Sequence, residues 1–428
     1  MEHIHNYTHY VKRRSALKQL VKEHHQVDRG LVMLIGGFEG ACDIFRQDAS
    51  FYYATGLKEP SLIALIDLEG QDSLYIPHNS EKRLIWTQSI LDYVQEDPSS
   101  VGFDDVCFLG EASDAYTLSP WSSLSEYAHL LTTLEEFLKR GLPLFTLLPS
   151  SPMAYIEQKL LFDRMMRSLQ RKDTDYKDIS CCMATLRRNK SREEVEDIYK
   201  AVEITCAAHE AAAKTIHPGV WEYQVQASLE YIFTVSASQK AFPSIVASGS
   251  NSTILHYNSN ERCMENDDVV VVDIGASYQG YCADITRTYP VSGVFNDRQK
   301  EIYDLVHSLQ QYVASCAKPG VWLVNKDNPE QSLHHLAIAY LKDHGYEDRM
   351  NHRIGHFLGL EVHDVGDYAE PLKMGDVITI EPGLYLEEES LGVRIEDDFW
   401  IVEDGSVCLS EALPRTHEAM ETMVQDQW

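Results

Sequence analysis

Residues 269–291 read VVVVDIGASYQGYCADITRTYPV, with two runs of β-branched side chains on either side of a turn. Such runs favour extended backbone, so the stretch predicts a β-hairpin. Folded about Tyr278-Gln279, the hairpin places Asp273 directly opposite Asp284. Two facing carboxylates repel each other, and among apolar neighbours their charges are costly unless they are paired or coordinate a metal.

A second hairpin is predicted from VITIEPGLYL (377–386) and GVRIEDDFWIV (392–402). Folded about Glu388-Glu389, it places Glu381 opposite Glu396. For either acidic pair alone, a solvated pair at a hairpin mouth is the better interpretation. Two such pairs in strands this apolar favour bound cations.

Histidines surround these acids in the sequence. The segment NHRIGHFLGLEVHDVG (351–366) carries His352, His356 and His363, and its glycines favour strand and turn over a long helix. His256 lies in ILHY, upstream of the first hairpin. Four carboxylates with imidazoles and no thiolate suit Mn²⁺, with Co²⁺ or Zn²⁺ as alternatives. Four acids exceed the needs of one ion, so the residues alone indicate a two-metal hydrolase of unknown substrate.

The chain has 428 residues, which favours two domains. The first part alternates short strand-like and helical runs, and a charged stretch places a boundary near residue 175, giving domains 1–175 and 176–428. Ser191 and Glu194 form a capping box for a helix that ends at Pro218-Gly219. The tetrapeptide Pro-Gly-Val-Trp recurs at 218–221 and 319–322, each time after a predicted helix, so the second domain is expected to contain two related halves.

Composition narrows the range of partners. The chain has 66 acidic and 37 basic residues, a net charge of -29, which opposes binding to nucleic acid or to anionic membranes. The nine cysteines are scattered, apart from the neighbours Cys181 and Cys182, and no Cys-x-x-Cys pair indicates zinc or redox chemistry. Without a signal peptide or a long apolar run, a cytoplasmic protein is expected.

Residues 180–428 resemble the pita-bread metallopeptidases, specifically aminopeptidase P and prolidase. The resemblance rests on ILHY, VDIG, ADITRTYPV, GHFLGLEVHDVG, TIEPGLY and GVRIEDD in that order. The segment FRQDASFYYATGLKEP (45–60) is similar to part of the smaller domain of aminopeptidase P. The expected fold is therefore mixed α/β (α+β), with a smaller N-terminal α/β domain and a C-terminal pita-bread domain.

The resemblance implies a role for each site residue. A metal-bridging hydroxide would attack the carbonyl of an Xaa-Pro bond, with Glu381 accepting the proton and passing it to the proline nitrogen. His256 and His363 would hydrogen-bond the substrate carbonyl region and the tetrahedral intermediate, His352 would line the proline pocket, and Arg394 would support Glu396. The implied ligands of two divalent metal ions are Asp273, Asp284, His356, Glu381 and Glu396, with Asp284 and Glu396 bridging both ions.

The expected substrates are peptides with proline at the second position, and the resemblance implies a homo-oligomer, a dimer or tetramer. Two departures from the family pattern are Arg353, where glycine is common, and Phe242, where many relatives have tyrosine. The stretch after His363 lacks the arginine that prolidases use to hold a dipeptide carboxylate, which favours aminopeptidase P. The alternatives are a prolidase and a catalytically weak pita-bread binding protein.

Overall fold

The computed structural model describes residues 7–40, 44–86, 89, 94–115, 118–149, 155–172 and 176–426. The chain forms two compact units, Met1–Arg187 and Arg188–Trp428. Residue 175, the expected boundary, lies outside the described residues, and the division falls further along the chain. The reason is a helix after residue 175 that is tied to the first unit: Tyr53 donates a hydrogen bond to the carbonyl of Leu186, and Arg187 donates one to the hydroxyl of Ser50.

The first unit, which we call the N-terminal unit, is built around a six-stranded sheet of order β4-β3-β2-β1-β5-β6. Its elements are α1 (Thr8–His25), β1 (Leu31–Ile35), α2 (Ala49–Thr55), β2 (Ile63–Asp67), β3 (Asp72–Ile76), β4 (Asp105–Phe108), α3 (Ala128–Lys139), β5 (Leu144–Thr146), α4 (Ile156–Ser168), β6 (Tyr176–Asp178) and α5 (Ser180–Arg188).

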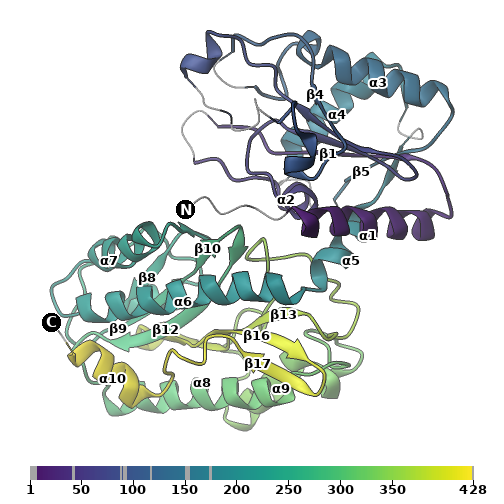
Figure 1. Cartoon of the computed structure of the whole chain (residues 1–428). Coiled ribbons are helices and arrows are strands. Elements are labelled where there is room, and N and C mark those ends of the chain that lie inside the picture. The colour runs from purple at the N-terminus through teal and green to yellow at the C-terminus, as the bar shows by residue number, and fades with distance from the viewer. Residues whose placement is uncertain are drawn as a thin grey trace. The chain divides into compact units, whose positions relative to one another are not determined.

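Apolar side chains are buried on both faces of the sheet, since all five residues of β1 are buried, and one core cluster lies on the face that α3 and α4 cover. Alternate residues of β1, namely Leu31, Met33 and Ile35, pack with apolar residues of α3 and α4, as the two-residue period of a strand requires. Figure 1 shows α1 on the side of the sheet away from α3. This confirms the α/β character expected for the first part of the chain.

The second unit carries four small antiparallel sheets among its described residues, and Figure 1 shows α6 alongside β9 and β12. Its elements are α6 (Arg192–Thr215), α7 (Glu222–Val235), β7 (Gln239–Lys240), β8 (Ile245–Ser248), β9 (Val269–Ile274), β10 (Ala276–Tyr278), β11 (Tyr281–Cys282), β12 (Ile285–Pro290), α8 (Asp297–Cys316), α9 (Leu333–Asp343), β13 (Val377–Ile380), β14 (Gly383–Leu386), β15 (Leu391–Arg394), β16 (Asp397–Val402), β17 (Gly405–Cys408) and α10 (His417–Gln425).

The two halves of this unit repeat the same turn after a long helix. The predicted capping box of Ser191 and Glu194 begins α6, and a second capping box begins α8. After α6, Gly219 has a φ of 88° and its N–H donates to the carbonyl of Met264 at 2.9 Å. After α8, Gly320 has a φ of 90° and donates in the same way to Leu372 at 2.9 Å. The left-handed backbone accounts for glycine at both positions, and the matching turns support two related halves.

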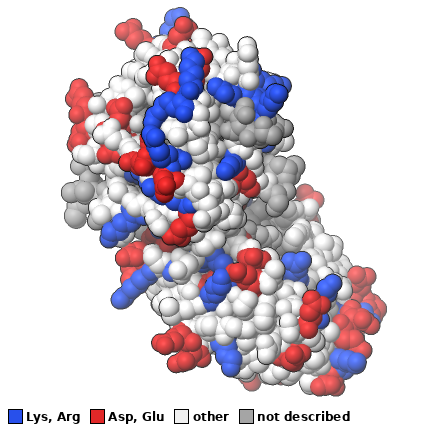
Figure 2. Space-filling view, turned by 90° about the vertical axis from the view of Figure 1, so that its right-hand side faces the viewer, with Lys and Arg blue, Asp and Glu red and all other residues white. Residues whose placement is uncertain are grey.

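The surface carries charges of both signs. Figure 2 shows Asp and Glu side chains interspersed with Lys and Arg on the face drawn. Some surface acids form salt bridges, for example Glu388 with Arg349 at 2.6 Å and Glu389 with Arg298 at 2.7 Å. Among the described residues, no helix combines the length and the apolar character that crossing a bilayer requires.

Candidate metal centre

The centre lies where the long hairpin of residues 377–402 is interrupted. The β13–β16 ladder ends at the pair Ile380–Asp397, and the β14–β15 ladder begins at Gly383–Arg394. Both ladders keep the register predicted from the sequence. Glu381 and Glu396 therefore face each other across the interruption, where neither is part of a ladder.

The first hairpin has a different register from the one predicted. Asp273 on β9 pairs with Thr286 on β12, so Asp284 is not its cross-strand partner. The turn consists of Gln279 and Gly280, whose φ angles of 49° and 87° are the two positive values of a type I′ turn. Centring the turn on this pair shifts the register by two residues, and Asp284 falls in the break between β11 and β12. The two carboxylates still lie close enough for the charge of Asp273 to raise the pKa of Asp284.

A pair of strands joins the two hairpins at the acids. The N–H of Glu396 donates to the carbonyl of Thr286 at 3.1 Å, and the reverse bond measures 3.4 Å. The Thr286 hydroxyl also donates to Oε2 of Glu396 at 2.7 Å. Both halves of the unit therefore contribute carboxylates to one cluster.

His356 completes this cluster. Ligand atoms of Asp284, His356 and Glu396 all lie within 4.8 Å of one another. Nε2 of His356 is 3.4 Å from Oδ2 of Asp284 and 3.6 Å from Oε1 of Glu381. Its Nδ1 lies 3.1 Å from the carbonyl of Phe357. Because a carbonyl only accepts, Nδ1 carries the proton in the neutral ring and Nε2 keeps a lone pair toward the carboxylates.

Burial and mutual repulsion shape the charges of the acids. Asp273, Asp284 and Glu396 are 9%, 5% and 2% exposed. Burial, reinforced by neighbouring carboxylates, raises the pKa of Asp284 and of Glu396 well above the usual range. Burial also raises the pKa of Glu381 to about 7, with His356 opposing the rise and Asp284 adding to it. Buried carboxylates that repel one another are stabilised by divalent cations, so the acids fit such ions.

The two carboxylate oxygens of Asp273 also suit a bound cation. Its Oδ2 accepts a hydrogen bond from Nη2 of Arg394 at 2.6 Å. Its Oδ1 is buried without a hydrogen-bond partner in the protein. An unpartnered buried carboxylate oxygen is costly, and a cation beside it would remove that cost.

Arg394 has a different direct partner from the one expected. Its guanidinium contacts Asp273, and it reaches Glu396 only through the Thr286 hydroxyl, to which Nε donates at 3.3 Å. The long side chain extends beyond its own strand toward β9, which residue spacing along one strand does not reveal.

Sequence reasoning missed Tyr385 and Asp398. The Tyr385 hydroxyl accepts from Nη1 of Arg394 at 3.0 Å and lies 2.9 Å from Nε2 of His352. Asp398 accepts the N–H of Asp284 at 3.1 Å, and its Oδ1 is buried without a partner. The one available signal is spacing: Asp398 lies two residues after Glu396, so both could have been placed on one strand face.

The remaining histidines lie around the cluster. His352 is partly buried, and burial, then Arg394, lowers its pKa to about 4. Nδ1 of His352 is 3.7 Å from Oε2 of Glu381. His363 is exposed and its ring centroid lies 4.4 Å from that of His356. His256 is exposed in a turn. Partial burial lowers the pKa of His363, and the nearby charges of His356 and then His256 lower it further.

The fold and the carboxylate–histidine cluster define the class of protein, a metal-dependent hydrolase. Residues 196–403 match the model of metallopeptidase family M24, and residues 10–118 match the N-terminal domain of aminopeptidase P. The Xaa-Pro aminopeptidase of Haemophilus influenzae is 30% identical over 408 residues, 89% of this chain and 88% of the relative. The chain belongs to metallopeptidase family M24.

Two further similarities bear on the fold and on specificity. An aminopeptidase P structure from Bacillus anthracis, described as putative, has a TM-score of 0.81 and 27% identity, covering 98% of both chains. The Xaa-Pro dipeptidase of Pyrococcus furiosus is 39% identical over 242 residues, 55% of this chain and 67% of that one. The first similarity confirms the expected pairing of a small N-terminal domain with a pita-bread domain.

Proposed function

We propose that the protein is an Xaa-Pro aminopeptidase that releases the first residue from peptides with proline in second place. The similarity to an Xaa-Pro aminopeptidase along both units carries this proposal, because it includes the N-terminal domain as well as the metal centre. The five expected ligand residues are present in the sequence, and four of them meet in one cluster of measured contacts.

The proposed metal ligands are Asp273, Asp284, His356, Glu381 and Glu396. We propose two divalent ions, with Mn²⁺ in first place and Co²⁺ or Zn²⁺ as alternatives, because oxygen donors predominate. When bound, such ions polarise a carbonyl group and lower the pKa of water. Arg394 holds one oxygen of Asp273, and Thr286 holds one oxygen of Glu396, so these two acids are fixed before any ion arrives.

The side chains around the acids have separate tasks in this proposal. Glu381 accepts a proton from the attacking water and delivers it to the proline nitrogen as the bond breaks. His256 and His363 donate hydrogen bonds to the substrate carbonyl and to the oxyanion that forms from it. His352 lines the proline pocket as a neutral ring, since burial lowers its pKa to about 4 and the Tyr385 hydroxyl holds its Nε2.

Chelation is expected to remove activity reversibly. After dialysis against EDTA, hydrolysis of an Xaa-Pro-Ala peptide should fall to background, because the chelator removes the ions that polarise the carbonyl and activate water. Back-titration with Mn²⁺, Co²⁺ or Zn²⁺ should restore activity and rank the metals. Activity that is indifferent to chelation contradicts the whole centre.

A prolidase is the second candidate, because the Xaa-Pro dipeptidase of Pyrococcus furiosus is 39% identical over 242 residues, 55% of this chain. Residues 364–376 contain no arginine for a dipeptide carboxylate. With metal present, we therefore expect Xaa-Pro-Ala to be cleaved with a higher kcat/KM than Xaa-Pro. An enzyme active only on the dipeptide would overturn the assignment as an aminopeptidase.

Two finer proposals concern the state of the protein. We propose a homo-oligomer, a dimer or tetramer, which light scattering on the purified protein would test. We also propose a cytoplasmic location, supported by the free thiols of the eight cysteines among the described residues. Neither nucleic acid nor a membrane is a proposed partner, given the net charge of -29.

A further inference from the structure

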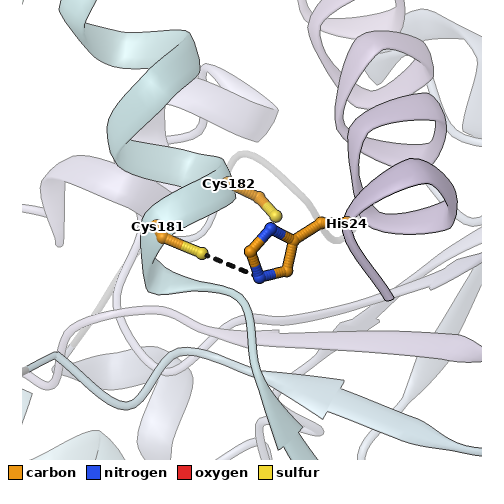
Figure 3. A group of neighbouring side chains, drawn as sticks. All are labelled: His24, Cys181 and Cys182. Atoms are coloured by element: carbon orange, nitrogen blue, oxygen red, sulfur yellow. Dashed lines mark hydrogen bonds between the residues drawn. The ribbon is translucent and has the colours of Figure 1, made fainter. Parts of the chain in front are cut away.

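A second group of metal-ligating side chains belongs to the N-terminal unit and shares no residue with the metal centre. His24 lies in the last turn of α1, and Cys181 and Cys182 lie in the first turn of α5 (Figure 3). One ligand atom from each lies within 4.8 Å of the other two. We propose that these three residues bind a thiophilic d¹⁰ metal ion, Zn²⁺ foremost, and leave its fourth position to water.

The geometry of the group fits such an ion. In tetrahedral zinc, with Zn–S of about 2.3 Å and Zn–N of about 2.0–2.1 Å, sulfur and nitrogen lie about 3.6 Å apart. Sγ of Cys181 and Nε2 of His24 are 3.6 Å apart. A thiol–imidazole hydrogen bond would also account for this pair, and the third ligand atom, from Cys182, lies within 4.8 Å of both. Figure 3 shows the sulfur atoms of both cysteines directed toward the imidazole.

Exposure allows an ion to enter. His24 and Cys181 are exposed to solvent, whereas Cys182 is 2% exposed. Two soft thiolates with one imidazole prefer Zn²⁺ or another d¹⁰ ion to the hard cations that suit carboxylates. Burial raises the pKa of the Cys182 thiol to about 12, so the free group is uncharged, and metal binding would release its proton.

The two helices are held in position independently of any ion. Ser180 is the first residue of α5, and both its N–H and its hydroxyl donate hydrogen bonds to Oδ1 of Asp178, just before the helix. Nε2 of His25, next to His24, lies 3.1 Å from the carbonyl of the same Asp178. These contacts fix both ends of the group, which reduces the ordering cost of binding.

Oxidation to a disulfide is the competing use of neighbouring cysteines. Consecutive Cα atoms lie about 3.8 Å apart, short of the roughly 4.4–6.8 Å that disulfides usually span. Cys181 and Cys182 also lie in a helix, whose backbone would have to change to join them. The arrangement therefore favours a shared ion over a bond between the two sulfurs.

The test is a titration of the full-length enzyme, loaded with Mn²⁺ and kept reduced with a phosphine, with Cd²⁺ as the probe. Thiolate-to-cadmium charge transfer gives an ultraviolet band, and the carboxylate–histidine centre has no sulfur to produce one. We expect a band that saturates at one Cd²⁺ per chain and is displaced by Zn²⁺. Cys181→Ser and His24→Asn should each weaken Cd²⁺ binding at least about tenfold, since even residues outside the ligand shell contribute this much.

Cys107→Ser is the matched control, because Cys107 lies on β4 of the same unit and outside the group. It should leave the band and the Cd²⁺ affinity unchanged. The absence of a sulfur band in the wild type, or equal losses in Cys107→Ser and Cys181→Ser, would overturn the proposal. Because His24 and Cys181 are exposed, both variants should fold, and Xaa-Pro-Ala hydrolysis should be unchanged in all three.

Discussion

Glu381→Gln is expected to lower kcat for an Xaa-Pro-Ala peptide by about 10²–10⁴-fold, the usual contribution of a positioned acid–base group. Glutamine keeps the shape of the side chain and one oxygen toward His356 but cannot take up and return a proton. Turnover should be measured alongside metal content, because Glu381 is also a proposed ligand.

The matched control for this variant is Glu387→Gln, which alters an exposed acid at the tip of the same hairpin. It should retain the turnover of the wild type. Full activity of Glu381→Gln with its metal in place would refute the proton-transfer role. A wild-type protein without turnover on any Xaa-Pro peptide would instead favour the catalytically weak binding protein.

The largest loss of stability is expected for Arg287→Ala. Arg287 on β12 is fully buried and pairs with buried Asp397 of the other half at 2.8 Å. Removing one partner of a buried pair costs about 3–5 kcal/mol, and Arg415, 2.7 Å from the other oxygen of Asp397, would compensate that acid only in part. Urea unfolding should show this as a lower free energy of unfolding. The guanidinium also donates to four carbonyl groups, those of Thr286, Glu396, Leu413 and Pro414.

Arg298→Ala provides the comparison at the surface, where Arg298 pairs with partly exposed Glu389. Exposed ion pairs contribute about 0–1 kcal/mol, so the free energy of unfolding of this variant should be close to that of the wild type. Arg287→Lys keeps the charge but not the forked geometry of the guanidinium. Its free energy of unfolding should lie between those of Arg287→Ala and Arg298→Ala. Equal losses for Arg287→Ala and Arg298→Ala would contradict the importance of the buried pair.

The two hairpins show how far sequence reasoning reached. The second was placed in the correct register, because its apolar runs and Glu-rich connection leave one symmetrical way to pair. The first was displaced by two residues, because the turn depends on backbone with positive φ at Gln279 and Gly280. Apolar alternation is unchanged by a shift of two, so only the turn chemistry could have fixed the register.

Contacts between segments far apart in the chain could not be predicted from the sequence. The structure brings Arg394 to Asp273 and Tyr385 to His352, and neither contact follows from spacing along one strand. The same holds for His24 and Cys181, which are 157 positions apart in the chain. The sequence showed two neighbouring cysteines without a zinc motif, because the third ligand comes from another helix.

The bridge between Thr286 and Glu396 joins two halves that each carry only part of the acidic set. Metal affinity and the docking of the halves are therefore thermodynamically linked. An ion that binds only the docked form stabilises it by RT ln(1 + [M]/Kd), about 2.7 kcal/mol at a hundredfold excess over Kd. A rise in free metal concentration would thus make the docked form of the second unit more resistant to unfolding.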